Sequence, residues 1–205
     1  MILGPTLQAT ALQLEQEFDQ IPVARKELLL QLSRYISNKK AAGQPIDLVF
    51  ICTHNSRRSH MAQLWAQAAA TSFAVEKVTT YSGGTEATAF YHAAVKAMQK
   101  AGFEVSKLTE DQNPMYAVTY ADAIAPVKVW SKKYDDAANP TAGFGAIMTC
   151  SDADGNCPFV EGAEKRIAIT YQDPKASDGT PQQEEVYFTR ALQIGREMLF
   201  VFSKV

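Results

Sequence analysis

The chain has 205 residues, of which 46% are hydrophobic, and a formal net charge of −2 at pH 7. This length suffices for one domain with a full core and argues against two independent domains. Because 20 basic residues stand against 22 acidic ones, the overall charge excludes a general attraction to nucleic acid or to an anionic membrane. No apolar run reaches the length of a membrane span, and the start lacks the pattern of a signal peptide. These features predict a cytoplasmic protein in which any anion site is local.

Residues 1–45 are predicted to form an N-terminal helical extension packed on the main domain. Helical patterns cover about residues 7–18 and the stretch from Val23, and Pro22 stands where a helix start favours proline. Gly43, Gln44 and Pro45 then break the pattern. The main domain is therefore expected to begin at residue 46.

Residues 46–205 alternate strand-like and helix-like patterns, which predicts an α/β fold with a mainly parallel sheet. The expected strands cover 46–51, 78–81, 144–149 and 167–171. One helix is expected to start at Ser59, and two others to cover 89–101 and 184–202. The predicted architecture is a three-layer sandwich in which a central four-stranded sheet is flanked by helices. Residues 105–142 are less regular, with only 127–130 strand-like, and are interpreted as an elaboration of this domain.

One loop carries the main chemical signal, and we call residues 52–59 the oxyanion loop. Backbone N–H groups of a short loop between strand and helix, together with the positive helix end, can converge on a tetrahedral anion, and Arg58 can add a bidentate clamp. The same field favours the thiolate form of Cys52, a nucleophile, and the Ser59 hydroxyl can donate to its sulfur. The alternative is a buried strand-end cysteine followed by two solvated arginines. The residues predicted to bind the anion are Thr53, His54, Asn55, Ser56, Arg57, Arg58 and Ser59.

A general acid is also expected, because a leaving oxygen must be protonated. Asp173 precedes Pro174 after a predicted strand, where a carboxyl group can face the nucleophile. The same Asp-Pro pair is a common turn, so the residues alone leave both interpretations open.

The other two cysteines are Cys150 and Cys157, seven residues apart after the strand at 144–149. A continuous helix would hold them ~10 Å apart, beyond the ~7 Å limit between the Cα atoms of a disulfide. The residues between them are strong turn formers, which favours a loop in which the thiols can pair. Two unrelated thiols and half of a metal site are the alternatives, but zinc would need further ligands. We therefore predict no metal site.

With these residues, the segment from about 46 to 202 resembles the low-molecular-weight protein tyrosine phosphatase fold family, and in particular its thioredoxin-coupled arsenate reductases. The resemblance implies that Cys52 is the nucleophile, that Arg58 clamps the oxyanion and that Ser59 stabilises the thiolate. It further implies that Asp173 is the general acid, and that Asn55 helps to hold the loop.

The same resemblance implies a reaction, the reduction of arsenate to arsenite in arsenic detoxification. Cys52 would form a thiol-arsenate adduct, Cys150 would displace it to give a Cys52–Cys150 disulfide, and Cys157 would resolve that disulfide. The implied partner is an external thiol reductant such as thioredoxin, with no bound cofactor.

Several residues depart from the family pattern. His54 stands where family loops usually carry glycine, Arg57 adds positive charge at the mouth, and Gln63 replaces a carboxylate that helps some reductases to bind a monovalent cation. Lys175 and Ala176 follow Asp173-Pro174 without the paired aromatics of many phosphatases, which counts against a phosphotyrosine substrate.

Two alternatives to the reductase stay open. A low-molecular-weight protein tyrosine phosphatase would hydrolyse phosphate monoesters through a Cys52 phosphocysteine, with Cys150 and Cys157 protecting the nucleophile. A redox-sensing regulator would bind phosphate or arsenate without turnover, and Asp173→Asn would leave it unchanged.

Overall fold

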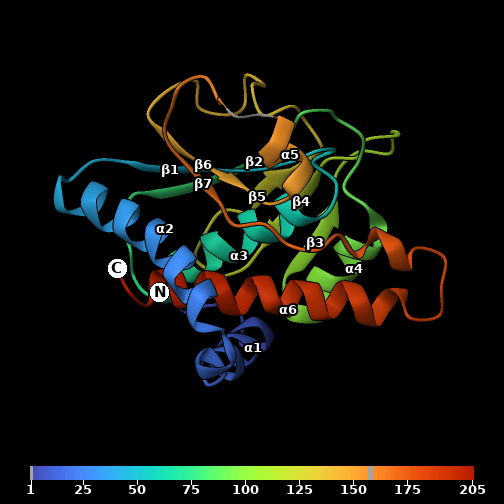
Figure 1. Cartoon of the computed structure of the whole chain (residues 1–205). Coiled ribbons are helices and arrows are strands. Elements are labelled where there is room, and N and C mark those ends of the chain that lie inside the picture. Colours follow the sequence, from blue (N-terminus) through green and yellow to red (C-terminus); the bar gives the residue numbers. More distant parts are fainter. Residues whose placement is uncertain (1, 157–158) are drawn as a thin grey trace.

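A four-stranded parallel sheet forms the centre of the computed structural model, which describes residues 2–156 and 159–205 (Figure 1). The strands, in spatial order, are β2 (Val78–Gly84), β1 (Ile46–Cys52), β6 (Phe144–Met148) and β7 (Ala163–Ala168). All neighbouring strands are parallel, and Ile51 of β1 pairs with Met148 of β6. Because the carboxyl ends of parallel strands meet at one edge, the residues after β1 and β6 lie together.

Helices cover one face of this sheet and a thinner layer covers the other. The helices are α1 (Pro5–Glu15), α2 (Val23–Ala41), α3 (Arg58–Ser72), α4 (His92–Ala101), α5 (Ser151–Asn156) and α6 (Gln183–Phe202), with 3₁₀ helices η1 (Phe18–Gln20) and η2 (Pro174–Ser177). Figure 1 shows α3 and α6 on one side of the sheet and α5 on the other. Leu48 and Phe50 join the larger core with Trp65, whereas Val49 and Ile51 face a smaller core. The alternation along β1 thus feeds both layers, and the predicted α/β sandwich is confirmed.

The N-terminal helices α1 and α2 pack on α6. Arg25 of α2 forms a 2.7 Å ion pair with Glu197 of α6, whose side chain is only 4% exposed. None of the helices in the described ranges is long and apolar enough to span a membrane.

Residues 105–142 hold more structure than the single strand expected. A second, antiparallel sheet has the order β3 (Glu104–Lys107), β4 (Tyr116–Thr119) and β5 (Val127–Val129). The last central strand also lies earlier than predicted, at Ala163–Ala168 instead of 167–171. It is an edge strand, and edge strands tolerate charged residues such as those at 164–166. The search for an apolar run had left these residues out of the predicted strand.

Two further elements differ from expectation at the oxyanion edge. Helix α3 begins at Arg58, with Arg57 as its N-cap, so Ser59 lies inside the helix and does not cap it. The segment after Cys150 forms the short helix α5 where a loop was expected. Asp152 and Asp154 in its first turn favour a helix through the helix dipole, and Ala153 is buried against the sheet.

Candidate active site

The oxyanion loop starts at the last residue of β1 and ends in the first turn of α3. In the described ranges, no protein group accepts a hydrogen bond from the backbone N–H groups of residues 53–57. Unpaired N–H groups at the N-terminus of a 15-residue helix are suited to an anion, because they add donors to the positive end of the helix dipole. The loop therefore offers donors that an oxyanion could use, and the binding role of its residues stays a prediction.

Two side chains, Ser59 and Asn55, hold Cys52 beneath this loop. Cys52 is 4% exposed, and its Sγ lies 3.1 Å from the Oγ of Ser59. Asn55 Nδ2 donates to the same Oγ at 2.9 Å. Since Ser59 accepts from Asn55, its own proton is free to point at the sulfur, which stabilises a thiolate.

Asn55 also ties the loop to the chain behind it. It has a φ of 44°, in the left-handed region that asparagine tolerates better than most residues. Its Oδ1 accepts the backbone N–H of Lys132 at 2.9 Å. Gly84, at the end of β2, leaves room for the turn: a Cβ there would lie 2.6 Å from the Thr53 carbonyl oxygen and 2.7 Å from the Asn55 nitrogen. The loop conformation therefore depends on both residues.

A buried cation lies behind this loop. Lys132 is 5% exposed, with its ammonium 4.4 Å from the centre of the Trp130 ring. Burial lowers the pKa of Lys132 to about 8, although Asp136 opposes the shift. Burial, aided by the Lys132 charge, lowers the pKa of His60 to about 3, so this histidine is neutral at pH 7. His60 packs against Phe90 and bonds Ser82, and has a structural role.

Arg58 and Asp173 are brought together, as a clamp and an acid require. Arg58 Nη2 donates to Asp173 Oδ2 at 2.5 Å, and Nη1 donates to the Tyr171 carbonyl at 2.9 Å. The Arg58 side chain is 8% exposed and that of Asp173 is 37% exposed, so the carboxylate is the more accessible partner of this ion pair. Asp173 also caps η2 by accepting the backbone N–H of Lys175.

Cys150 lies beside the loop, at the end of the neighbouring strand. It is fully buried, its Sγ is 3.5 Å from the Oγ1 of Thr53, and the Ala153 N–H donates to it at 3.3 Å. The backbone N–H and the hydroxyl of Thr149 both bond the Ile51 carbonyl, which joins the two strand ends. Cys52 and Cys150 share the smaller core. Cys157, the third predicted cysteine, lies outside the described residues.

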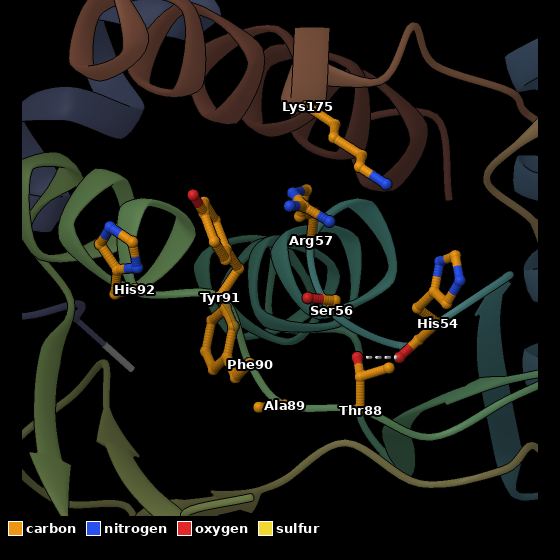
Figure 2. Close-up of a pocket in the computed structure, with 9 residues that line it drawn as sticks. All are labelled: His54, Ser56, Arg57, Thr88, Ala89, Phe90, Tyr91, His92 and Lys175. Carbon is orange, nitrogen blue, oxygen red and sulfur yellow. Dashed lines mark hydrogen bonds between the residues drawn. The ribbon is translucent and has the colours of Figure 1, made fainter. Parts of the chain in front are cut away.

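Three residues of the oxyanion loop, His54, Ser56 and Arg57, line a pocket of about 500 Å³ beside the loop (Figure 2). His54 and Ser56 lie on one wall, Tyr91 and His92 on another, and Lys175 extends over the space. The His54 side chain is half-exposed, and its Nε2 lies 3.5 Å from Glu86. Its carbonyl accepts from Thr88, the bond dashed in Figure 2, and from Ser131.

Arg57 lines the same pocket and is held there by two partners. Its Nε donates to the Tyr187 hydroxyl at 2.6 Å, and its Nη2 donates to Asp178 at 2.8 Å. Sequence reasoning missed Asp178, Tyr187 and Lys132, because each meets the loop through a contact between distant parts of the chain.

Comparisons with known proteins agree with this geometry. No protein-family model matches the chain. Curated relatives include the arsenate reductase of Bacillus licheniformis, 29% identical over 143 residues that span 70% of this chain and 84% of the relative. The arsenate reductase of Bacillus subtilis is 28% identical with the same coverage.

Solved structures show the same architecture. A low-molecular-weight phosphotyrosine phosphatase from Vibrio cholerae O395 superposes with a TM-score of 0.53 at 14% identity, covering 77% of this chain and 95% of its own. The chain has the low-molecular-weight phosphatase fold. An arsenate reductase in a phosphate-binding state also matches, with a TM-score of 0.51 at 16% identity, covering 78% of this chain and 98% of its own. The predicted resemblance is thereby confirmed, and the curated relatives support an enzyme.

Proposed function

We propose that this chain reduces arsenate to arsenite by a relay through Cys52, Cys150 and Cys157. The observation that carries the proposal is the position of Cys150, buried against Thr53 of the oxyanion loop at the end of the strand next to Cys52. A second thiol so close to a nucleophile supports disulfide exchange, which simple hydrolysis of an ester does not need. The arsenate reductase relatives support the same substrate.

The first step forms the adduct. The Cys52 thiolate, held by Ser59, attacks the arsenic of an arsenate bound by the loop N–H groups. Arg58 stabilises the oxyanion charge, for which it must exchange its contact with Asp173 for the substrate. Asp173 gives a proton to the departing hydroxide, so water and a Cys52–arsenate bond are the products.

The second step reduces the arsenic. The Cys150 thiolate attacks Cys52 Sγ, a disulfide forms, and the electron pair of the sulfur–arsenic bond stays on arsenic, which leaves as arsenite. Cys157 then attacks Cys150 and releases the Cys52 thiolate. An external dithiol, such as thioredoxin, would reduce the remaining disulfide, and this requirement supports a reducing, cytoplasmic location.

The relay requires α5 to change. Residues Ser151–Asn156 form a helix directly after Cys150. A continuous helix would hold residues seven positions apart about 10 Å from each other, since a helix rises about 1.5 Å per residue. Disulfide formation between the two cysteines therefore needs the helix to unwind. The helix has only six residues, and short helices have little stability of their own.

The deciding experiment measures arsenite formation by the purified protein with arsenate, thioredoxin, thioredoxin reductase and NADPH, beside hydrolysis of an aryl phosphate. Cys150→Ser should abolish arsenite formation but leave hydrolysis within about twofold, because water completes hydrolysis. Cys157→Ser is the matched control, and it should release about one arsenite per protein and then stop with a trapped disulfide. Arsenite formation that survives Cys150→Ser would contradict the relay.

Hydrolysis of phosphate monoesters is the second candidate. The pocket of about 500 Å³ beside the oxyanion loop is many times larger than arsenate requires and could hold the organic part of an ester. Ester hydrolysis unchanged in Cys150→Ser, without any arsenite formation by the unsubstituted protein, would favour this function.

A further inference from the structure

Two consecutive arginines of the oxyanion loop contact the two ends of one short segment. We call residues 173–178 the acid segment, because it begins at Asp173 and continues through the 3₁₀ helix η2. Arg58 pairs with Asp173 at 2.5 Å, and Arg57 pairs with Asp178 at 2.8 Å. The loop that holds the nucleophile therefore also holds the segment that carries the acid.

Two of the three guanidinium nitrogens of Arg57, Nε and Nη2, donate hydrogen bonds to protein partners. The side chain is 12% exposed, and its guanidinium carbon lies 4.2 Å from the centre of the Tyr91 ring (Figure 2). Nε donates to the Tyr187 hydroxyl and Nη2 to Asp178 Oδ2. Tyr187 in turn donates to Asp178 Oδ1 at 2.5 Å, so both carboxylate oxygens of Asp178 are occupied.

This arrangement is costly to rearrange. If Arg57 turned toward an oxyanion, Asp178 would lose its charged partner and Tyr187 would lose a donor in a partly buried place. Arg58 has a different relation to its partner, because contact with the substrate frees Asp173 to act on that substrate. Only one of the two arginines is therefore suited to exchange its carboxylate for the anion.

We propose that Arg57 is a positioning residue, which holds the acid segment over the oxyanion loop through Asp178 and Tyr187 and does not bind the oxyanion. The sequence had placed Arg57 among the anion ligands. The inference rests on the proposed function in one respect, that Asp173 is the acid whose position matters. A displacement of a catalytic group by about 1 Å can lower a rate by about a hundredfold.

The kinetic test compares Arg57→Ala, Arg57→Lys, Asp178→Asn and the Arg57→Ala/Asp178→Asn double variant in arsenate turnover. Arg57→Ala and Asp178→Asn should each lower kcat about tenfold with KM within about twofold, because substrate binding is intact and the acid is misplaced. Arg57→Lys keeps the pair with Asp178 and should recover most of kcat. The double variant should be no slower than the worse single variant, as expected for residues that act as a unit.

A second measurement does not need turnover. Inorganic phosphate should protect Cys52 from iodoacetamide, and mass spectrometry of the Cys52 peptide gives the protection constant. We expect this constant to stay within about twofold in Arg57→Ala, whereas hydrogen exchange in the acid segment should speed up at least about tenfold. Arg196→Ala is the matched control. It removes a half-buried ion pair between Arg196 of α6 and Glu17, just before η1, and should change neither the protection constant nor the hydrogen exchange.

The outcomes separate the two proposals. A protection constant weakened about tenfold in Arg57→Ala but not in Asp178→Asn would make Arg57 an anion ligand and overturn the inference. Unchanged hydrogen exchange in the acid segment would overturn it as well. If the unsubstituted protein reduces no arsenate, the proposed function fails, and the phosphate and exchange measurements still decide the role of Arg57.

Discussion

The two cysteines at the carboxyl edge of the sheet lie in regions of different construction. Cys52 lies under a loop whose shape is fixed by Asn55, by Ser59 and by the close approach of Gly84. Cys150 precedes a six-residue helix in which only Ala153 is fully buried among the side chains described. The ion pair of Asp154 with Arg166 is half-exposed, and such pairs add little stability. Cys52 therefore lies in a rigid region held by several contacts, whereas Cys150 precedes a segment that few of the described contacts hold in place.

Gly84→Ala would break the rigid region and is the largest effect that we expect. A Cβ would lie 2.3 Å from the Glu86 carbonyl oxygen and 2.6 Å from that of Thr53, so backbone must move. We expect a loss of about 3 kcal/mol in the free energy of unfolding and a fall of more than about a hundredfold in kcat for arsenate and aryl phosphate alike. Urea unfolding and both assays test this, and near-normal turnover would show that the loop is less constrained than described.

Lys132→Met would relieve an electrostatic cost in the rigid region. The pKa of Lys132 in the folded protein is about 8, below the usual ~10.4. Below pH 8 the charged lysine therefore destabilises the folded protein by its full cost, and the free energy of unfolding rises as the pH increases from about 8 to about 10. We expect the free energy of unfolding of the variant to exceed that of the unsubstituted protein by up to about 3 kcal/mol at pH 7. This difference should disappear by about pH 10. Urea unfolding at pH 7 and pH 10 measures this, and an equal difference at both values would contradict it.

Gly155→Ala would stabilise the segment that we expect to rearrange, and it is the smallest effect. A Cβ at position 155 meets nothing within 4 Å, and alanine favours a helix by about 1 kcal/mol over glycine. If α5 must unwind in the relay, arsenite turnover should slow by up to about fivefold, with aryl phosphate hydrolysis unchanged. Faster turnover in this variant would argue against unwinding as a required step.

Sequence patterns predicted well what neighbouring residues determine. The apolar strands and the oxyanion loop are local features, because the loop runs without interruption from Cys52 at the end of β1 to Ser59 in the first turn of α3. The partners of Arg57 could not be predicted in this way, since Asp178 and Tyr187 lie 121 and 130 residues further along the chain.

Two other features were missed because their local signals are weak. Strands β3 and β4 have only four residues each, and three of the four residues of β3 are exposed, so no long apolar alternation marks them. Helix α5 consists mostly of turn-forming residues, and its burial against the sheet through Ala153 outweighs their preferences.

The contact between Arg25 and Glu197 connects helix α2 to the residues around the oxyanion loop. The Arg25 guanidinium also lies 4.8 Å from the centre of the Tyr171 ring, and the Tyr171 carbonyl accepts from Arg58. A chain trimmed to begin at residue 46 would leave the Glu197 carboxylate buried without its cation and Tyr171 without its cover. Helices α1 and α2 therefore cannot be removed or replaced without loss of these contacts, and designs that reuse this scaffold must keep both helices.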